Sequence, residues 1–238
     1  MTGSPELTNY DSIVEKYVAH TERPSSWNNL YERPYMLSKL RSLKNKDVLD
    51  LGCGTGFYTK YALEMGAQVT AVDASKVMID RLASLINSPK LKLVCADITK
   101  PLTFIEPESI DCVICSLVLH YIEDWSPLIS ELYRTMRKDG ELIISTHHPF
   151  MDYLSLDKSS YFEKKLIEDT WGRGSENQIT VHYYTRSLAD LLKPIIESKF
   201  NIVSIDEPLP TQDIKQISPR IYERLSEKPG FLFIVLRR

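Results

Sequence analysis

Three glycines at alternate positions, Gly52, Gly54 and Gly56, form a G-x-G-x-G turn between an apolar run and a segment with helical period. Glycine lets the backbone pass close to a ligand and adopt torsion angles that a Cβ atom would forbid. The helix that begins behind the turn offers unpaired N–H groups to an anionic or polar ligand. The turn therefore predicts a binding site for such a ligand, but alone it does not identify the ligand.

Three aspartates stand where they could serve this turn. Asp73 ends the second predicted strand, 21 residues after Gly52, where a carboxylate would accept hydrogen bonds from both ribose hydroxyls of a nucleoside. Asp97 ends the third predicted strand and could meet an adenine edge. Asp50 directly precedes the turn and could hold the loop or a ligand ammonium group. The alternative for Asp73 and Asp97 is that they only cap the helices that come after them.

The residue after the turn narrows the class of ligand. A dinucleotide enzyme would carry G-x-G-x-x-G, which requires glycine where this chain has Phe57, so the ligand is expected to lack a pyrophosphate. The segment Leu49-Asp-Leu-Gly-Cys-Gly-Thr-Gly56, followed by Asp73-Ala-Ser-Lys-Val-Met78, resembles the signature of class I S-adenosylmethionine-dependent methyltransferases. The resemblance covers residues 46–146 and is specific for the cofactor, not for the methyl acceptor.

The resemblance implies S-adenosyl-L-methionine as the cofactor, S-adenosyl-L-homocysteine as the product, and a role for each matching residue. The residues facing the methionine part would be Gly52, Cys53, Gly54 and Gly56, and Asp73 would hold the ribose. The residues around the adenine and the sulfonium would be Ala74, Met78, Asp97, Ile98, Ser116 and Leu117. An aromatic or basic residue of the N-terminal helices often covers the methionine end in this family. Tyr10, Tyr17, Tyr31 and Arg33 are the candidates, of which we assign Tyr31 and Arg33 to the site together with Asp50.

Histidines follow the fourth and fifth predicted strands, at the carboxyl edge where open α/β sheets bind their ligands. His120 lies in the loop after Ser116, and His147 and His148 follow the fifth strand directly. In methyl transfer the protein mainly aligns donor and acceptor, and a base helps only if the acceptor is protonated, as a hydroxyl or thiol would be. His120, His147 and His148 are therefore candidate catalytic residues, and the alternative is that they only anchor loops.

The cysteines predict core packing and no metal site. Cys112 and Cys115 form a C-x-x-C inside a β-branched run. Residues three apart in a strand point to opposite faces, so the two thiols could not easily share a metal or a disulfide. We expect reduced cysteines.

Apolar runs alternate with helical patterns along the chain. The predicted strands are 46–51, 68–73, 91–96, 110–116 and 141–146, and the predicted helices are 55–65, a segment capped by Ser75, and 125–136. This alternation implies right-handed βαβ crossovers and a mostly parallel sheet covered on both faces. In the helical stripe at 187–199, Pro194 predicts a kink or a later start. Strands 201–205 and 231–236, with no helical pattern between them, should form an antiparallel pair at one sheet edge.

We therefore expect one α/β domain, 1–238, with a Rossmann-like, seven-stranded, mostly parallel sheet and an antiparallel last strand. A helical cap (1–45) precedes the cofactor-binding core (46–146), and a helix and strand pair (187–238) end the chain. Residues 147–186 are too long for a plain connection and predict a substrate-binding lid. The aromatic residues of this insertion, which could exclude water or form a small satellite core, include Tyr153, Tyr161, Phe162, Trp171, Tyr183 and Tyr184.

Composition sets the remaining expectations. The 238 residues are 43% apolar and 26% charged with a net charge of −3, which excludes a disordered chain and argues against a nucleic-acid partner. No run of 18 apolar residues and no leader pattern is seen, which predicts a cytoplasmic protein without membrane contact, either monomer or homodimer. We expect methyl transfer to an oxygen, nitrogen or sulfur atom of a small molecule. The alternatives are a protein or tRNA methyltransferase and a catalytically silent cofactor-binding module.

Overall fold

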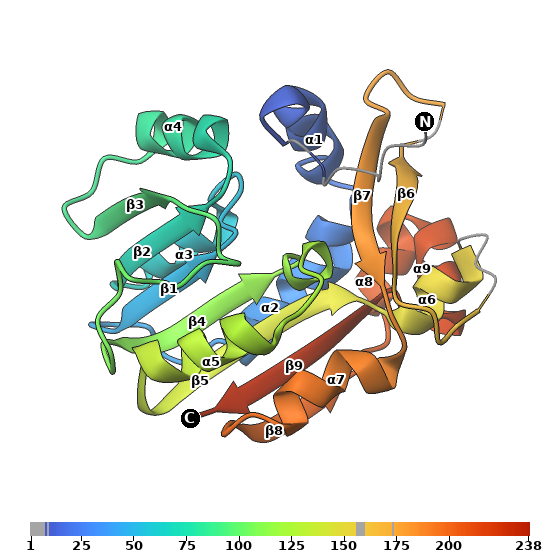
Figure 1. Cartoon of the computed structure of the whole chain (residues 1–238). Coiled ribbons are helices and arrows are strands. Elements are labelled where there is room, and N and C mark those ends of the chain that lie inside the picture. The colour runs from blue at the N-terminus through green and yellow to red at the C-terminus, as the bar shows by residue number, and fades with distance from the viewer. Residues whose placement is uncertain (1–7, 9, 156–159, 173) are drawn as a thin grey trace, which may run out of the picture.

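A seven-stranded sheet forms the centre of the computed structural model, which describes residues 8, 10–155, 160–172 and 174–238. Its strands are β1 (Asp47–Leu51), β2 (Gln68–Asp73), β3 (Leu91–Cys95), β4 (Ile110–Ser116), β5 (Met136–His147), β8 (Asn201–Asp206) and β9 (Phe231–Arg237). The spatial order is β3-β2-β1-β4-β5-β9-β8 (Figure 1). Strands β1 to β5 pair in parallel, and β9 is antiparallel to both β5 and β8. The expected Rossmann-like sheet and its antiparallel strand pair at one edge are confirmed.

Helices cover both faces of the sheet because the strands carry apolar side chains on both sides. Helices α5 (Ser126–Thr135) and α7 (Leu188–Ile196) pack on one face, and α2 (Arg33–Lys39) and α3 (Phe57–Glu64) on the other (Figure 1). Cys112 and Cys115 belong to the cores on opposite faces, which confirms the prediction that they are packing residues. Helix α4 (Lys76–Leu85) starts at the predicted cap, since Ser75 Oγ accepts a hydrogen bond from Met78 N at 3.1 Å.

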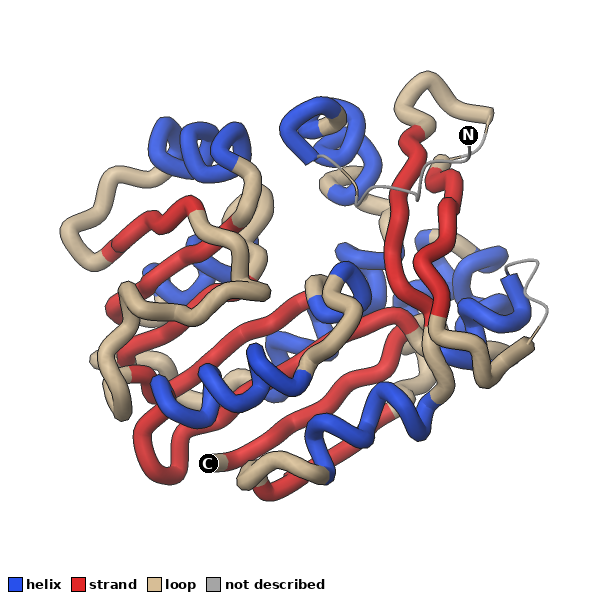
Figure 2. Tube along the Cα trace, viewed as in Figure 1, coloured by secondary structure: helices blue, strands red, loops and turns tan. Residues whose placement is uncertain are grey.

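The insertion after β5 and the N-terminal cap meet beyond the carboxyl ends of the strands. The insertion contains α6 (Pro149–Ser155) and a two-stranded antiparallel hairpin of β6 (Lys165–Trp171) and β7 (Ile179–Thr185). Helix α1 (Val14–Thr21) lies between α4 and this hairpin, as the tube in Figure 2 also shows. It contacts both sides: Glu15 pairs with Arg81 of α4 at 3.3 Å, and the His20 ring stacks on Trp171 of β6 with centroids 5.8 Å apart.

The N-terminal cap continues through short turns. A 3₁₀ turn (Tyr10–Ser12) precedes α1, and a single π-helical turn (Asn28–Glu32) leads into α2. Another 3₁₀ turn, η3 (Leu119–Tyr121), follows β4.

Three local expectations need correction. The segment between β8 and β9 is helical, with α8 (Gln212–Ile217) and α9 (Pro219–Glu227). Pro219 stands at the start of α9, where its missing N–H would be unpaired in any residue, so it begins a helix rather than excluding one. Strand β6 was not predicted, because its residues alternate only weakly. Helix α7 begins at Leu188, before Pro194, so the later start is wrong.

Candidate active site

The glycine turn after β1 leaves open backbone beside a cavity. Gly52 N and Cys53 N both donate to Val72 O, at 2.7 and 2.9 Å, which ties the turn to β2. Gly52 has φ +67°, and a Cβ atom there would lie 2.2 Å from Val118 Cγ2. At Gly54 the nearest heavy atom to such a Cβ would be 4.0 Å away. A ligand can therefore approach the main chain at Gly54.

Three further residues of the motif, Gly56, Cys53 and Asp50, pack around the turn. Gly56 begins α3 with φ +83°, and a Cβ atom there would lie 2.2 Å from Leu82 Cδ1, so this glycine allows α4 to pack closely. Cys53 is buried in the core. Asp50 is buried and accepts a hydrogen bond from Thr59 Oγ1 at 2.6 Å, and burial raises its pKa to about 7. None of these three predicted cofactor residues is among those that line the cavity.

Asp73 and Asp97 lie at the ends of adjacent strands and both border the cavity. Asp73 accepts hydrogen bonds from Gly54 N at 2.8 Å and Ser75 N at 2.9 Å, so it joins the glycine turn to the start of α4. Burial raises the pKa of this carboxyl. Asp97 accepts from Thr99 N at 2.9 Å and Thr99 Oγ1 at 2.7 Å. Both aspartates therefore cap the backbone segment after their strand and also present a carboxylate to the cavity.

This first cavity has a volume of about 220 Å³ and lies at the carboxyl ends of β1, β2 and β4. Nine predicted cofactor residues line it: Gly52, Gly54, Asp73, Ala74, Met78, Asp97, Ile98, Ser116 and Leu117. The lining residues that were not assigned to the site are Thr8, Tyr10, Tyr17, Thr99, Val118, Tyr121 and Ile122. Carboxylates at one wall and apolar side chains at the others suit a nucleoside, whose sugar is polar and whose base is flat.

Tyr31 and Arg33 do not line the cavity, contrary to their assignment. The Tyr31 ring is buried against Phe231 and Phe233, and its hydroxyl donates to Pro208 O. Arg33 pairs with Glu22 at 3.2 Å and stacks over the Phe57 ring at 4.1 Å. The cap residues that reach the cavity are Tyr10, in the 3₁₀ turn before α1, and Tyr17 of α1, whereas Tyr31 and Arg33 belong to the later π-helical turn and α2. Tyr10 and Tyr17 were candidates that the sequence could not rank.

A buried carboxylate that sequence reasoning missed lies behind the cavity. Glu32 accepts hydrogen bonds from Tyr58 Oη at 2.7 Å, Ser116 Oγ at 2.8 Å and Ser145 Oγ at 2.5 Å. Burial raises its pKa, against the effect of these hydrogen bonds. The carboxylate joins the N-terminal cap to the ends of β4 and β5. Nothing in the pattern around residue 32 marks it as buried.

A second cavity of about 340 Å³ adjoins the first. The two share three lining residues, Tyr17, Leu117 and Tyr121. The remaining wall includes four aromatic residues, Trp27, Trp171, Tyr183 and Phe231. The polar lining residues are His20, Thr21, Arg23, Asn28, His147, Asp152, Asp169 and Arg224. The second cavity is therefore a chamber of aromatic and polar side chains, and its charged residues include both acidic and basic groups.

The three candidate histidines have different surroundings. His147 lines the second cavity, with its Nδ1 3.7 Å from Asp152 Oδ1. Burial lowers the pKa of His147 to about 4, so its ring is neutral at neutral pH. His120 is buried behind it, and the two rings stack with centroids 3.9 Å apart. His148 borders neither cavity, since its Nε2 lies 2.6 Å from Glu207 Oε1 and its Nδ1 accepts from Phe150 N at 3.1 Å.

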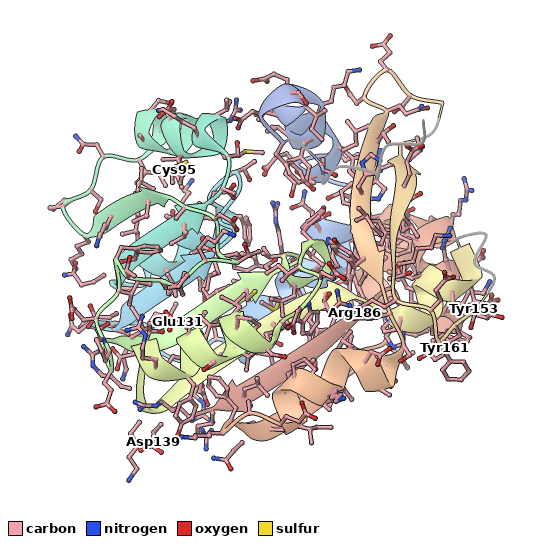
Figure 3. The ribbon with its side chains drawn as sticks, in the orientation of Figure 1. Cys95, Glu131, Asp139, Tyr153, Tyr161 and Arg186 are labelled. Atoms are coloured by element: carbon pink, nitrogen blue, oxygen red, sulfur yellow. The ribbon has the colours of Figure 1, made fainter. Side chains whose placement is uncertain are left out.

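The aromatic residues of the insertion divide into two groups. Trp171 and Tyr183, from the hairpin, line the second cavity. Tyr153 and Tyr161 contact each other on the outer side of α6, away from both cavities (Figure 3). The hairpin thus supplies part of the chamber wall, and α6 with the segment after it supplies a separate aromatic contact.

The described residues contain no cluster of His, Cys, Asp or Glu side chains that could hold a metal ion. In the same residues no helix is both long and apolar enough to cross a membrane. Asp73 and Asp97 bring carboxylates to the first cavity, and the His147–Asp152 pair is among the polar groups of the second.

Known proteins resemble this chain in both sequence and fold. A family model described as a methyltransferase domain matches residues 49–144. An uncharacterized protein of Haemophilus influenzae is 29% identical over 96% of this chain and 95% of its own. A ubiquinone biosynthesis O-methyltransferase of Pseudomonas entomophila is 24% identical over 69% of this chain and 73% of its own. The crystal structure of an S-adenosylmethionine dependent methyltransferase from Mesorhizobium loti superposes with a TM-score of 0.71 and 25% identity, covering 87% of this chain and 97% of its own.

Proposed function

Because the chain belongs to the class I S-adenosylmethionine-dependent methyltransferases, with S-adenosylmethionine as its cofactor, we propose that it methylates a small molecule bound in the second cavity. One observation carries the proposal: the two cavities share the wall formed by Tyr17, Leu117 and Tyr121. A methyl group at that wall would face an acceptor in the aromatic chamber. A chamber of about 340 Å³ suits a metabolite and is narrow for a polymer.

The first cavity fits the cofactor at its main chain and its carboxylates. The open backbone at Gly54 would approach the amino acid part, and Asp73 would accept bonds from the ribose hydroxyls. Ala74, Met78 and Ile98 offer the apolar surface that the adenine ring requires. The cofactor supplies an electrophilic methyl group on a sulfonium, and the protein supplies alignment, worth about 7–11 kcal/mol of the barrier in well-oriented systems.

His147 is the proposed base for a hydroxyl acceptor. Its ring is neutral, so one nitrogen carries a lone pair. Nδ1 lies 3.7 Å from Asp152 Oδ1, and a proton held on Nδ1 beside this carboxylate would leave the lone pair on Nε2. With the cofactor supplying the methyl group and retaining the electrons of the carbon–sulfur bond, Nε2 would accept the proton of the acceptor hydroxyl. The carboxylate of Asp152 stabilises the imidazolium that results, as the acidic partner of a catalytic histidine does in other enzymes. A neutral amine acceptor would not need this base.

The proposal is tested with methyl-labelled S-adenosylmethionine and fractionated cell extract. We expect label in the fraction below about 1 kDa, a size range that matches the ligands of such pockets. The label should survive treatment of the extract with protease and nuclease before the reaction. Label confined to protein or tRNA would show macromolecular methylation instead. Binding of S-adenosylhomocysteine without any labelled product in any fraction would favour a silent module.

A further inference from the structure

His120 has no protein partner for either ring nitrogen within the part of the chain that the structure describes, although it is only 3% exposed. It lies in η3, directly after β4. Aromatic rings pack against it: Tyr121 is tilted, with the ring centroids 4.3 Å apart, and Tyr183 lies nearly perpendicular, with the centroids 5.5 Å apart. A buried imidazole with two unpaired nitrogens is unfavourable, so a further partner is expected at the edge of the ring.

A small cavity borders the His120 ring. It has a volume of about 10 Å³, close to what a single water molecule requires. Its polar lining residues are His120, Thr146, His147, Asp152, Tyr184 and Arg186. Arg186 stands where β7 joins the body of the protein (Figure 3) and donates to Ile122 O at 2.6 Å. A water there has the two to four polar partners that a buried water needs.

We propose that this cavity holds one buried water molecule, and that His120 is a positioning residue that acts on His147 through this water. The second part rests on the proposed function of His147 as a base. The two rings stack at 3.9 Å with 13° between their planes, so their in-plane nitrogens cannot bond to each other directly. A water at the edge of both rings can bridge them.

The chemistry of the lining residues sets the direction of the hydrogen bonds. Arg186 can only donate, so the water accepts from the guanidinium and directs its own hydrogens to acceptors. The acceptors in reach are an imidazole nitrogen of His120 and the carboxylate of Asp152. This arrangement holds Asp152 toward Nδ1 of His147 and keeps the proton on that nitrogen. The lone pair of Nε2 is then presented to the acceptor chamber. The titratable groups around His120 and the small cavity are His147, Arg186, Tyr121, Tyr183, Tyr184 and Asp152.

The test compares the whole protein with His120→Phe, which keeps a ring and removes both nitrogens, and with His120→Asn and His120→Gln, which each restore one polar atom. Leu119→Met, in the same turn, controls for altered packing. Three measurements are made: a crystal structure of the S-adenosylhomocysteine complex, ¹⁵N NMR of the His147 tautomer in that complex, and the pH profile of kcat for a hydroxyl acceptor.

We expect ordered water density in the cavity of the native protein and of Leu119→Met. We expect the Nδ1–H tautomer of His147 in both, and a mixture of tautomers in His120→Phe. The Phe variant should lose about 10-fold in kcat, part of the 10²–10⁴ that a general base contributes, with unchanged S-adenosylhomocysteine affinity. One of the two amide variants should restore most of the loss.

An empty cavity with both His120 nitrogens bonded directly to protein groups would overturn the proposal. A native tautomer of His147 in folded His120→Phe would overturn it equally. The water density and the tautomer are read in a complex that lacks the acceptor, so they decide this inference even if no methyl acceptor of the hydroxyl class exists. Loss of kcat in His147 variants, by contrast, reports on the proposed function alone.

Discussion

Asp73 combines a structural role in the loop with a position at the wall of the first cavity. It bonds Gly54 N and Ser75 N and also borders the first cavity. Asp73→Asn keeps an oxygen for one of these amides but loses the charge. We expect S-adenosylhomocysteine affinity to fall by about 2 kcal/mol, or about 30-fold, in calorimetry.

The matched control is Asp80→Asn, which removes a charge from an exposed pair on α4. It should leave the affinity unchanged. Unchanged affinity in Asp73→Asn would mean that this carboxylate serves only the loop.

His147 is expected to act on turnover and not on cofactor binding. His147→Asn should lower kcat for a hydroxyl acceptor about 10²- to 10⁴-fold, because the acceptor proton then has no base. Its S-adenosylhomocysteine affinity should stay native, since His147 does not line the first cavity. His148→Asn serves as the control, because that ring is bonded to Glu207 outside both cavities. Equal losses in the two variants would argue against a base.

The buried state of His147 also predicts a dependence of stability on pH. Its pKa falls to about 4 in the folded protein, from the usual value near 6.5, so between these values the unfolded chain binds more protons. The free energy of unfolding should therefore fall as pH is lowered from about 6.5 toward 4, at up to about 1.4 kcal/mol per pH unit for this group.

Urea unfolding of the native protein and of His147→Gln across pH 7 to pH 5 measures this dependence. We expect a shallower slope in the variant. Parallel slopes would show that another group, such as His120, carries the acid sensitivity.

At the scale of elements, the turn between β1 and α3 separates binding from packing within a few residues. Gly54→Ala meets open space, so its main effect is to block the ligand, besides the strain of φ +50°. Gly56→Ala drives a methyl group into Leu82 and should cost about 1–3 kcal/mol of stability.

Calorimetry and chemical denaturation of both variants should therefore give opposite rankings. The Gly54 variant should be the weaker binder and the Gly56 variant the less stable protein. A binding loss in Gly56→Ala without any loss of stability would place Gly56 in the ligand site.

The elements that the sequence predicted well are those with a strong local pattern. Strands β1 to β5 are apolar runs bounded by clear turns, and Ser75 is followed by a regular helical stripe. Helices α8 and α9 bury few residues, among them Ile214 and Leu225, so each has only a narrow apolar stripe. The prolines of this segment were the stronger signal, and they favoured a loop. Strand β6 is paired only with β7, and its burial depends on α1 across a long sequence separation. No local pattern could reveal that contact.

The same limit applies to the site. Residues at strand ends, such as Asp73 and Leu117, could be predicted because parallel strands bring their carboxyl ends together. The N-terminal cap does not pair with the sheet, so no strand register fixes which of its side chains reach the cavity. The sequence therefore offered four candidates without a basis for ranking them: Tyr10, Tyr17, Tyr31 and Arg33. The wall of the second cavity likewise depends on how the hairpin packs against α1, and this tertiary contact has no local sequence pattern.

Over the whole molecule, Glu32 joins the cap to the sheet. Three hydroxyl groups from α3, β4 and β5 converge on this one carboxylate. Glu32→Leu would leave them buried without their acceptor, at a cost of about 1–3 kcal/mol for each hydroxyl that finds no other partner.

In Glu32→Leu, amide hydrogen exchange should become faster first at residues 28–39 and at the ends of β4 and β5. Glu15→Leu, at an exposed position on α1, is the control. Native exchange at these sites would mean that the hydroxyls find other acceptors.

Tyr17 and Tyr121 have a consequence for thermodynamics. Each ring touches both chambers, so a ligand that shifts either ring in one chamber alters the fit in the other. Free energy is a state function, so the influence is reciprocal: whatever factor the acceptor imposes on the affinity for the nucleoside, the nucleoside imposes on the affinity for the acceptor. Under the proposed function, occupancy of the enzyme then depends on the concentrations of cofactor and acceptor together, and neither binding constant measured alone describes it.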